Sequence, residues 1–194
     1  MDYFIYENTS LSSEVCDKII QLFDIENQKK ITGCKKNIFE QKINSNLLEN
    51  NVWFDIKNVL LNEIKIHLEL YYNKLDNKIF HFDITHKNKT INDFIIKKYI
   101  KHDKDEKNNI SQRCKNSSNN VIDLVNKKMS VLNFIWYLNS IDNGGETECI
   151  GSYKIKPEMG KMVLFPSDWF FHYYNNPPIS SDKYIITGLI YIDI

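Results

Sequence analysis

Hydrophobic and polar positions divide the 194-residue chain into a helical first part and a strand-rich second part. In SLSSEVCDKIIQLFD, apolar residues recur on one helical face behind serines that can cap the first turn, which predicts a helix over residues 13–24. A longer stripe predicts a second helix over residues 51–73, with Trp53, Ile56, Leu60, Ile64, Leu68 and Tyr71 on its apolar face. His67 flanks this stripe and is interpreted as a packing residue. Residues 3–6 predict a short strand before the first helix.

The period of the pattern changes from helical to strand-like after residue 76. Strands are predicted where apolar runs are bounded by Gly, Pro, Asn or Asp: 79–85, 93–101, 131–139, and the segments SYKIKP, KMVLFP and KYIITGLIYI. DNGG (142–145) has the chemistry of a turn, whereas residues 102–128 form a long polar segment without a period, as functional or disordered loops do. Helices followed by many short strands predict an α+β fold that is mainly β, built as a sandwich or barrel.

Composition narrows the class of protein. Lys+Arg and Asp+Glu each number 25, so the chain lacks the basic excess of a general nucleic-acid or anionic-membrane binder. No apolar run is long enough to cross a membrane, and the first residues do not resemble a signal peptide, so we expect a cytoplasmic protein. The four cysteines lack CxxC spacing, which argues against a zinc site. The length fits one domain over residues 1–194, with helical support over about 1–75 and a barrel over about 79–194 that carries the loop 102–128.

Seven short motifs follow one another in the last third of the chain. In order they are Tyr137-Leu138-Asn139, Gly144-Gly145-Glu146-Thr147, Pro157…Gly160, Phe165-Pro166…Trp169, His172, Pro177-Pro178 and Lys183-Tyr184…Thr187-Gly188. In this order and at this spacing they closely resemble the C-terminal half of prolyl 4-hydroxylase-like oxygenases, which depend on Fe(II) and 2-oxoglutarate. The early helix SSEVCDKIIQLF and the FIIKKY strand resemble the family more loosely. The resemblance implies a double-stranded β-helix (jelly-roll or cupin-like), a squashed barrel of two antiparallel sheets with supporting N-terminal helices.

The chemistry of such oxygenases assigns roles to the matching residues. Two His and one carboxylate hold the iron and leave positions open for the 2-oxo acid and for O₂. The far carboxylate of 2-oxoglutarate needs a cation, preferably with a hydroxyl or phenol beside it. The resemblance implies His172 as a metal ligand and Lys183 as the cation. Thr147 and Tyr99 match positions that bind the same carboxylate, although a turn residue and a core residue are the alternatives.

Gly188 is expected where the cosubstrate approaches the strand backbone.

The other two iron ligands depart from the family pattern, because a His-x-Asp pair should follow the Tyr99 strand and none does. Three interpretations stay open. His102 with Asp103 or Asp105 supplies the ligands from a shortened loop; His81-Phe82-Asp83, the one His-x-Asp in the chain, supplies them from another strand; or both ligands are lost. We take His172, His102 and Asp105 as the provisional metal set and assign no further catalytic residue.

The sequence therefore predicts an Fe(II)- and 2-oxoglutarate-dependent dioxygenase that hydroxylates a C–H bond, in a prolyl or related residue of a peptide or protein. Fe(II), 2-oxoglutarate and ascorbate are the implied cofactors. The alternative is a catalytically degenerate relative of the same fold that binds a peptide or protein partner. No residue pattern indicates the oligomeric state.

Overall fold

The computed structural model describes residues 4–32, 37–43, 51–76, 89–91, 93–102, 114–116, 122–123, 125–149, 152–167 and 171–194. They form two helices, α1 (Ser13–Thr32) and α2 (Val52–Asp76). They also form twelve strands: β1 (Tyr6–Thr9), β2 (Ile38–Ile43), β3 (Lys89–Ile91), β4 (Phe94–Tyr99), β5 (Cys114–Asn116), β6 (Ile122–Asp123), β7 (Lys128–Tyr137), β8 (Thr147–Cys149), β9 (Tyr153–Ile155), β10 (Lys161–Pro166), β11 (Tyr173–Asn175) and β12 (Lys183–Asp193). The α+β, mainly β prediction is confirmed.

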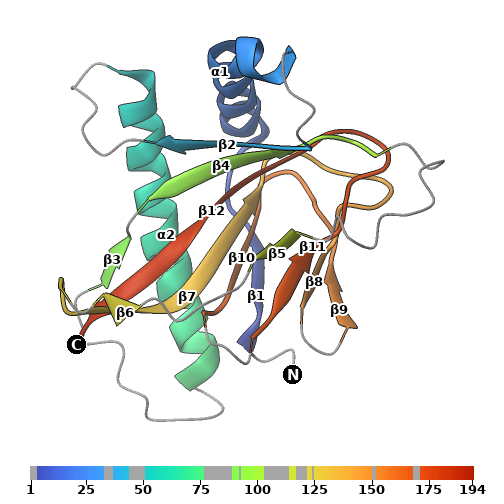
Figure 1. Cartoon of the computed structure of the whole chain (residues 1–194). Coiled ribbons are helices and arrows are strands. Elements are labelled where there is room, and N and C mark those ends of the chain that lie inside the picture. Colours follow the sequence, from blue (N-terminus) through green and yellow to red (C-terminus); the bar gives the residue numbers. More distant parts are fainter. Residues whose placement is uncertain are drawn as a thin grey trace.

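The strands make two antiparallel sheets. The large sheet has the order β1-β10-β7-β12-β4-β2, with β3 added beside β12 and β6 beside β7. The small sheet has the order β5-β11-β8-β9. Both helices lie on one side of the large sheet, and the small sheet lies beyond its other side (Figure 1). The N-terminal part of the chain thus contributes two strands to the large sheet, β1 and β2, as well as the helices.

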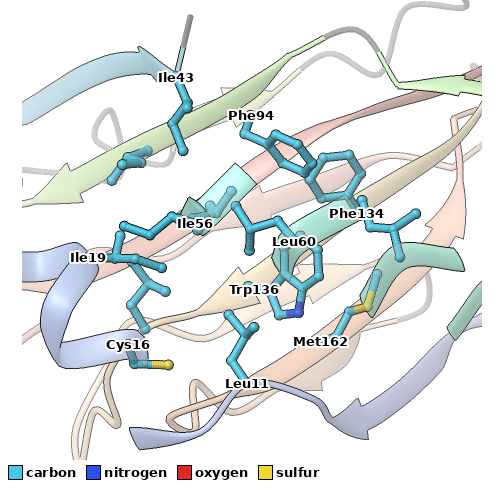
Figure 2. Packing of buried hydrophobic residues seen from close by; sticks show 14 of the residues in the cluster. Leu11, Cys16, Ile19, Ile43, Ile56, Leu60, Phe94, Phe134, Trp136 and Met162 are labelled. Carbon is cyan, nitrogen blue, oxygen red and sulfur yellow. The ribbon is translucent and has the colours of Figure 1, made fainter. Parts of the chain in front are cut away.

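The central strands β7, β10 and β12 are apolar on both faces, because each face covers a different core. Side chains alternate along a strand, so Phe134 and Trp136 of β7 face one core while Ile135 and Tyr137 face the other. The first core is shared with the helices. Figure 2 shows Cys16 and Ile19 of α1, Ile56 and Leu60 of α2, and Phe94, Phe134, Trp136 and Met162 of the large sheet packed together.

The second core lies between the two sheets. Its buried members are Ile5, Tyr99, Ile135, Tyr137, Cys149, Ile155, Val163, Phe165, Tyr173 and Ile185. They come from β4, β7, β10 and β12 of the large sheet, from β8, β9 and β11 of the small sheet, and from the residue before β1. This core holds the two sheets together and surrounds the polar residues described below.

The predicted elements agree with the structure at most positions, with shifted boundaries. The first helix continues to Thr32, eight residues beyond the predicted end, and the first strand covers Tyr6–Thr9 instead of residues 3–6. The polar segment 102–128 contains two short strands, β5 and β6, which the sequence did not predict. The strand predicted over residues 79–85 lies outside the described residues.

An ionic cluster ties α1 to the large sheet. Lys98 Nζ on β4 lies 3.1 Å from Asp24 Oδ1 on α1 and 3.4 Å from Asp182 Oδ2. The Tyr184 hydroxyl on β12 donates a 2.7 Å hydrogen bond to the other oxygen of Asp24. Burial lowers the pKa of Lys98, but hydrogen bonds with Tyr184 and Asp24 raise it by more, so this lysine stays charged.

His67 lies on the face of α2 that packs against β1. Its Nδ1 and the hydroxyl of Tyr6 are 2.7 Å apart and share a hydrogen bond, and its Nε2 lies 3.5 Å from Glu63. Only 4% of His67 is exposed, which confirms its interpretation as a packing residue.

Among the described helices, none combines the length and apolar character that a membrane crossing requires.

Candidate functional site

A fully buried lysine marks the space between the two sheets. Lys183 is the first residue of β12 and stands directly opposite Tyr99 of β4, and none of its surface is exposed. Its ammonium group donates hydrogen bonds to the carbonyl oxygen of Gly145 at 2.7 Å and to Oδ1 of Asn175 at 2.9 Å. Both acceptors are uncharged. A buried ammonium group forms strong charge-assisted hydrogen bonds with carboxylates, so this lysine suits an anionic ligand.

The carbonyl that accepts from Lys183 belongs to the predicted turn at 142–145. Gly144 and Gly145 have φ angles of +72° and +75°. A side chain on Gly144 would place its Cβ 2.6 Å from the carbonyl oxygen of Pro177, so only glycine fits there. The backbone N–H of Gly145 donates to the same oxygen at 3.0 Å. The turn is therefore fixed against the Pro177-Pro178 segment, with one carbonyl directed at Lys183.

The small sheet supplies the polar groups that face Lys183. Thr147 of β8 and Asn175 of β11 are paired across the two strands, and they are 0% and 1% exposed. The Thr147 hydroxyl donates to Oδ1 of Asn175 at 2.9 Å and accepts from the Tyr137 hydroxyl at 2.6 Å. Lys183 and Thr147, both selected from the sequence, thus meet at the amide oxygen of Asn175.

Two tyrosines line the lysine. Lys183 Nζ lies 5.0 Å from the ring centroid of Tyr99 and 5.8 Å from that of Tyr137, within the range of cation–π attraction. Burial raises the pKa of Tyr137 far above its usual range, although the hydrogen bond with Thr147 opposes the shift. The phenol of Tyr137 therefore stays protonated and remains a donor to Thr147. Tyr99, the third residue selected for this site, is 3% exposed.

The two described histidines of the predicted metal set lie beside strands of different sheets, β4 of the large sheet and β11 of the small sheet. His102 follows β4, is half-buried, and its backbone N–H donates to the carbonyl oxygen of Pro178 at 2.8 Å. His172 precedes β11 and is exposed. Its neighbours Phe171 and Tyr173 both pack against Phe165, with ring centroids 5.6 and 4.8 Å apart.

The family comparison matches this part of the chain. Residues 98–191 match the model of the 2OG-Fe(II) oxygenase superfamily, and this range includes Tyr99, His102, Thr147, His172 and Lys183. The chain is thus similar to the 2OG-Fe(II) oxygenase superfamily over just under half of its length. No curated protein sequence matches the chain significantly.

Solved structures of prolyl hydroxylases share the fold of this chain. A viral collagen prolyl hydroxylase from Paramecium Bursaria Chlorella virus-1, solved as a 2OG complex, aligns with a TM-score of 0.60 at 17% identity and covers 98% of this chain and 96% of its own. A Trichoplax adhaerens prolyl hydroxylase, solved with a hypoxia inducible factor peptide, gives 0.64 at 14% identity over 98% and 84% of the two chains. A Pseudomonas putida prolyl-4-hydroxylase gives 0.52 at 11% identity over 96% and 91%. The predicted double-stranded β-helix is confirmed.

The described residues fit one end of 2-oxoglutarate better than they fit iron. The lysine, the threonine and a buried amide with an unused donor, Asn175 Nδ2, suit a carboxylate. Within the described ranges, no group of three His, Cys, Asp or Glu side chains is placed to hold a metal ion. Asp105, Asp103 and the His81-Phe82-Asp83 motif lie outside the described residues. The choice among the three ligand interpretations therefore stays a prediction.

Gly188 has a different role from the one expected. A Cβ at this position would lie 2.4 Å from the carbonyl oxygen of Asp93 and 2.5 Å from Cζ of Phe134. Phe134 belongs to the core shared with the helices, on the side of the sheet away from Lys183. The glycine is therefore required by close packing of this core, and its Cβ position faces away from Lys183.

Sequence reasoning missed Asn175. Its residue type carries no motif, and it lies on a strand of only three residues, too short to show a period. The signal that identifies it is its register, because Asn175 stands opposite Thr147. That pairing is visible only in the folded chain.

Proposed function

We infer that this chain is an Fe(II)- and 2-oxoglutarate-dependent dioxygenase that hydroxylates a C–H bond, in a prolyl or related residue of a peptide or protein. The balanced reaction consumes 2-oxoglutarate and O₂ and yields succinate, CO₂ and the hydroxylated product. One oxygen atom enters succinate and the other enters the substrate. The match of residues 98–191 to the superfamily model supports the reaction type, and the prolyl hydroxylase neighbours support the substrate class.

The buried position of Lys183 is the observation that carries this proposal. Its ammonium group would bind the far carboxylate of 2-oxoglutarate in a charge-assisted hydrogen bond, in a setting that excludes bulk water. Tyr99 and Thr147 would flank that carboxylate, Tyr99 through its position opposite Lys183 and Thr147 through the hydrogen bonds that orient Asn175. The oxo-acid end would then be directed away from Lys183.

The assignment of the metal ligands is supported by the similarity to the family and by the sequence motifs. His172 and His102 would each offer an imidazole nitrogen, and Asp105 would offer the carboxylate. Fe(II), when bound, supplies O₂ activation coupled to the decarboxylation of 2-oxoglutarate, and ascorbate would keep it in the ferrous state. We derive no further step through the metal.

Turnover of 2-oxoglutarate tests this function. The purified chain is titrated anaerobically with Fe(II), mixed with 2-oxoglutarate, ascorbate and a proline-containing peptide, and exposed to O₂. Succinate is then measured by NMR, and a mass increase of one oxygen atom is sought in the peptide. Lys183→Met serves as the variant that lacks the proposed anchor, and Lys97→Met is its matched control, because Lys97 lies on the neighbouring strand β4 and pairs with the exposed Glu40 of β2.

We expect succinate from the native chain and from Lys97→Met, and little from Lys183→Met. A folded native chain that takes up no metal and forms no succinate would contradict the enzyme. Peptide retention by that same inactive sample would support the binding module instead.

A further inference from the structure

The side-chain amide of Asn175 has only one possible orientation. Lys183 Nζ can donate hydrogen bonds but cannot accept them, so the Asn175 atom 2.9 Å away must be the oxygen. The Thr147 hydroxyl is 2.9 Å from that same oxygen and must also donate to it. Because the single hydroxyl proton of Thr147 is used there, the protonated phenol of Tyr137 donates to Thr147. Lys183 and Thr147 therefore both donate to Oδ1, and Tyr137 fixes the direction of the Thr147 hydroxyl. These hydrogen bonds leave Nδ2 on the other side of the amide.

The fixed amide leaves a buried donor group unused. Asn175 is 1% exposed, and its Nδ2 has no hydrogen-bond partner among the residues that the structure describes. A buried N–H₂ without a partner is unfavourable and rare in native proteins, and a ligand that accepts from it removes the penalty. The same amide accepts from Lys183 through its oxygen, so Nδ2 is separated from the ammonium group by no more than the amide itself.

We propose that Asn175 Nδ2 is a second donor, beside Lys183 Nζ, to the far carboxylate of 2-oxoglutarate, and that Asn175 thereby helps to select a dicarboxylic cosubstrate. This rests on the proposed function. Thr147 then acts through Asn175: its hydroxyl proton already goes to Oδ1, so it positions the amide and does not itself donate to the ligand. A carboxylate has two oxygens and can accept from the ammonium and the amide at once.

Asn175→Asp separates this role from a structural one. The aspartate keeps the shape of the side chain and an oxygen that accepts from Lys183 and Thr147, but it replaces the N–H₂ donor by an acceptor. The dissociation constants of 2-oxoglutarate and of its 5-carboxamide are measured by calorimetry in the presence of Mn(II), in place of Fe(II), for the native chain, Asn175→Asp and Lys183→Met. The melting temperature of each variant reports its folding.

The ratio of the two dissociation constants is the decisive readout. The native chain is expected to prefer 2-oxoglutarate, and Asn175→Asp is expected to reduce that preference at least tenfold and to favour the carboxamide, whose N–H₂ can donate to the new oxygen. An unchanged ratio in folded Asn175→Asp, with binding still lost in Lys183→Met, would overturn this inference alone. A folded native chain that binds neither ligand would overturn the proposed function, and the role of Asn175 with it.

A measurement on the native chain covers the case in which Asn175→Asp does not fold. The side-chain N–H₂ resonances of Asn175 are followed by ¹H–¹⁵N NMR while 2-oxoglutarate or pyruvate, which lacks the far carboxylate, is added with Mg(II). A shift with 2-oxoglutarate and none with pyruvate supports the proposal. Identical responses to the two acids contradict it.

Discussion

Lys183 and Asn175 lie on different sheets, yet the lysine ammonium donates a 2.9 Å hydrogen bond to the asparagine oxygen. The contact spans the inside of the double-stranded β-helix and joins the first residue of β12 to the last residue of β11. Asn175 precedes Lys183 by only eight positions, and the loop between them includes the Pro177-Pro178 segment that holds the Gly144-Gly145 turn. The site is therefore assembled by the loop between the two sheets as much as by the strands.

Gly188→Ala is expected to destabilise the fold. The new methyl group would overlap the carbonyl of Asp93 and the ring of Phe134, and overpacking of this kind costs about 1–3 kcal/mol. Chemical denaturation measures the loss in the free energy of unfolding, and calorimetry measures 2-oxoglutarate binding. A variant of native stability that binds 2-oxoglutarate more weakly would contradict the packing role and restore the cosubstrate role expected from the sequence.

The cluster around Asp24 is expected to stabilise the docking of α1 by more than a surface ion pair does. Asp24→Ala removes hydrogen bonds from both Lys98 and Tyr184, and the loss should be about 1–3 kcal/mol. A double-mutant cycle with Lys98→Met should give a coupling energy of about 1 kcal/mol. Glu40→Ala with Lys97→Met is the matched cycle on the same sheet, where Glu40 is exposed and the coupling should be near zero. Equal coupling in the two cycles would contradict the prediction.

Acidification is expected to destabilise the protein through His67. Burial lowers the pKa of His67 below its usual 6.5, and attraction to Glu63 opposes this only in part. The unfolded chain therefore binds this proton more readily than the folded chain does, so the stabilising contribution is complete above about pH 6.5 and is lost as the pH falls. Denaturation at pH 7.5 and pH 5.5 should show a smaller difference for His67→Gln than for the native chain.

If His67→Gln and the native chain lose the same stability between the two pH values, His67 is not responsible.

The thiols of Cys16 and Cys149 are expected to resist modification in the folded protein. Burial raises the pKa of Cys16 to about 11 and that of Cys149 to about 12, and only the thiolate reacts. Each pKa unit lowers the thiolate fraction about tenfold, so alkylation at pH 8 should be at least about a hundredfold slower than in denaturant. Maleimide labelling of a Cys34→Ser/Cys114→Ser variant measures this. Rapid labelling under native conditions would contradict the buried placement.

Local patterns in the sequence predicted the features that depend on neighbouring residues. The apolar stripe of α2 and the apolar runs of β7 and β12 predicted these elements because their periods extend over many residues. The strands β8 and β11 are three residues long, which leaves no period to detect. The motif resemblance found Lys183 and Thr147, and both lie in the candidate site.

Asn175 could not be predicted in the same way, because its importance depends on the register of two strands and on a contact between two sheets. The role expected for Gly188 failed for a related reason. The side of β12 that a residue faces follows from the strand's position between two cores, and the sequence showed one long apolar run there. Long-range packing decides such features.

The affinity for 2-oxoglutarate tests the central claim most directly. Calorimetry with Mn(II) compares the native chain with Lys183→Met and with the control Lys97→Met. Loss of a buried charge-assisted hydrogen bond of about 1.5–3 kcal/mol should weaken binding about ten- to a hundredfold in Lys183→Met and leave Lys97→Met unchanged. Equal affinity in the folded native chain and folded Lys183→Met would contradict the placement of the cosubstrate at Lys183.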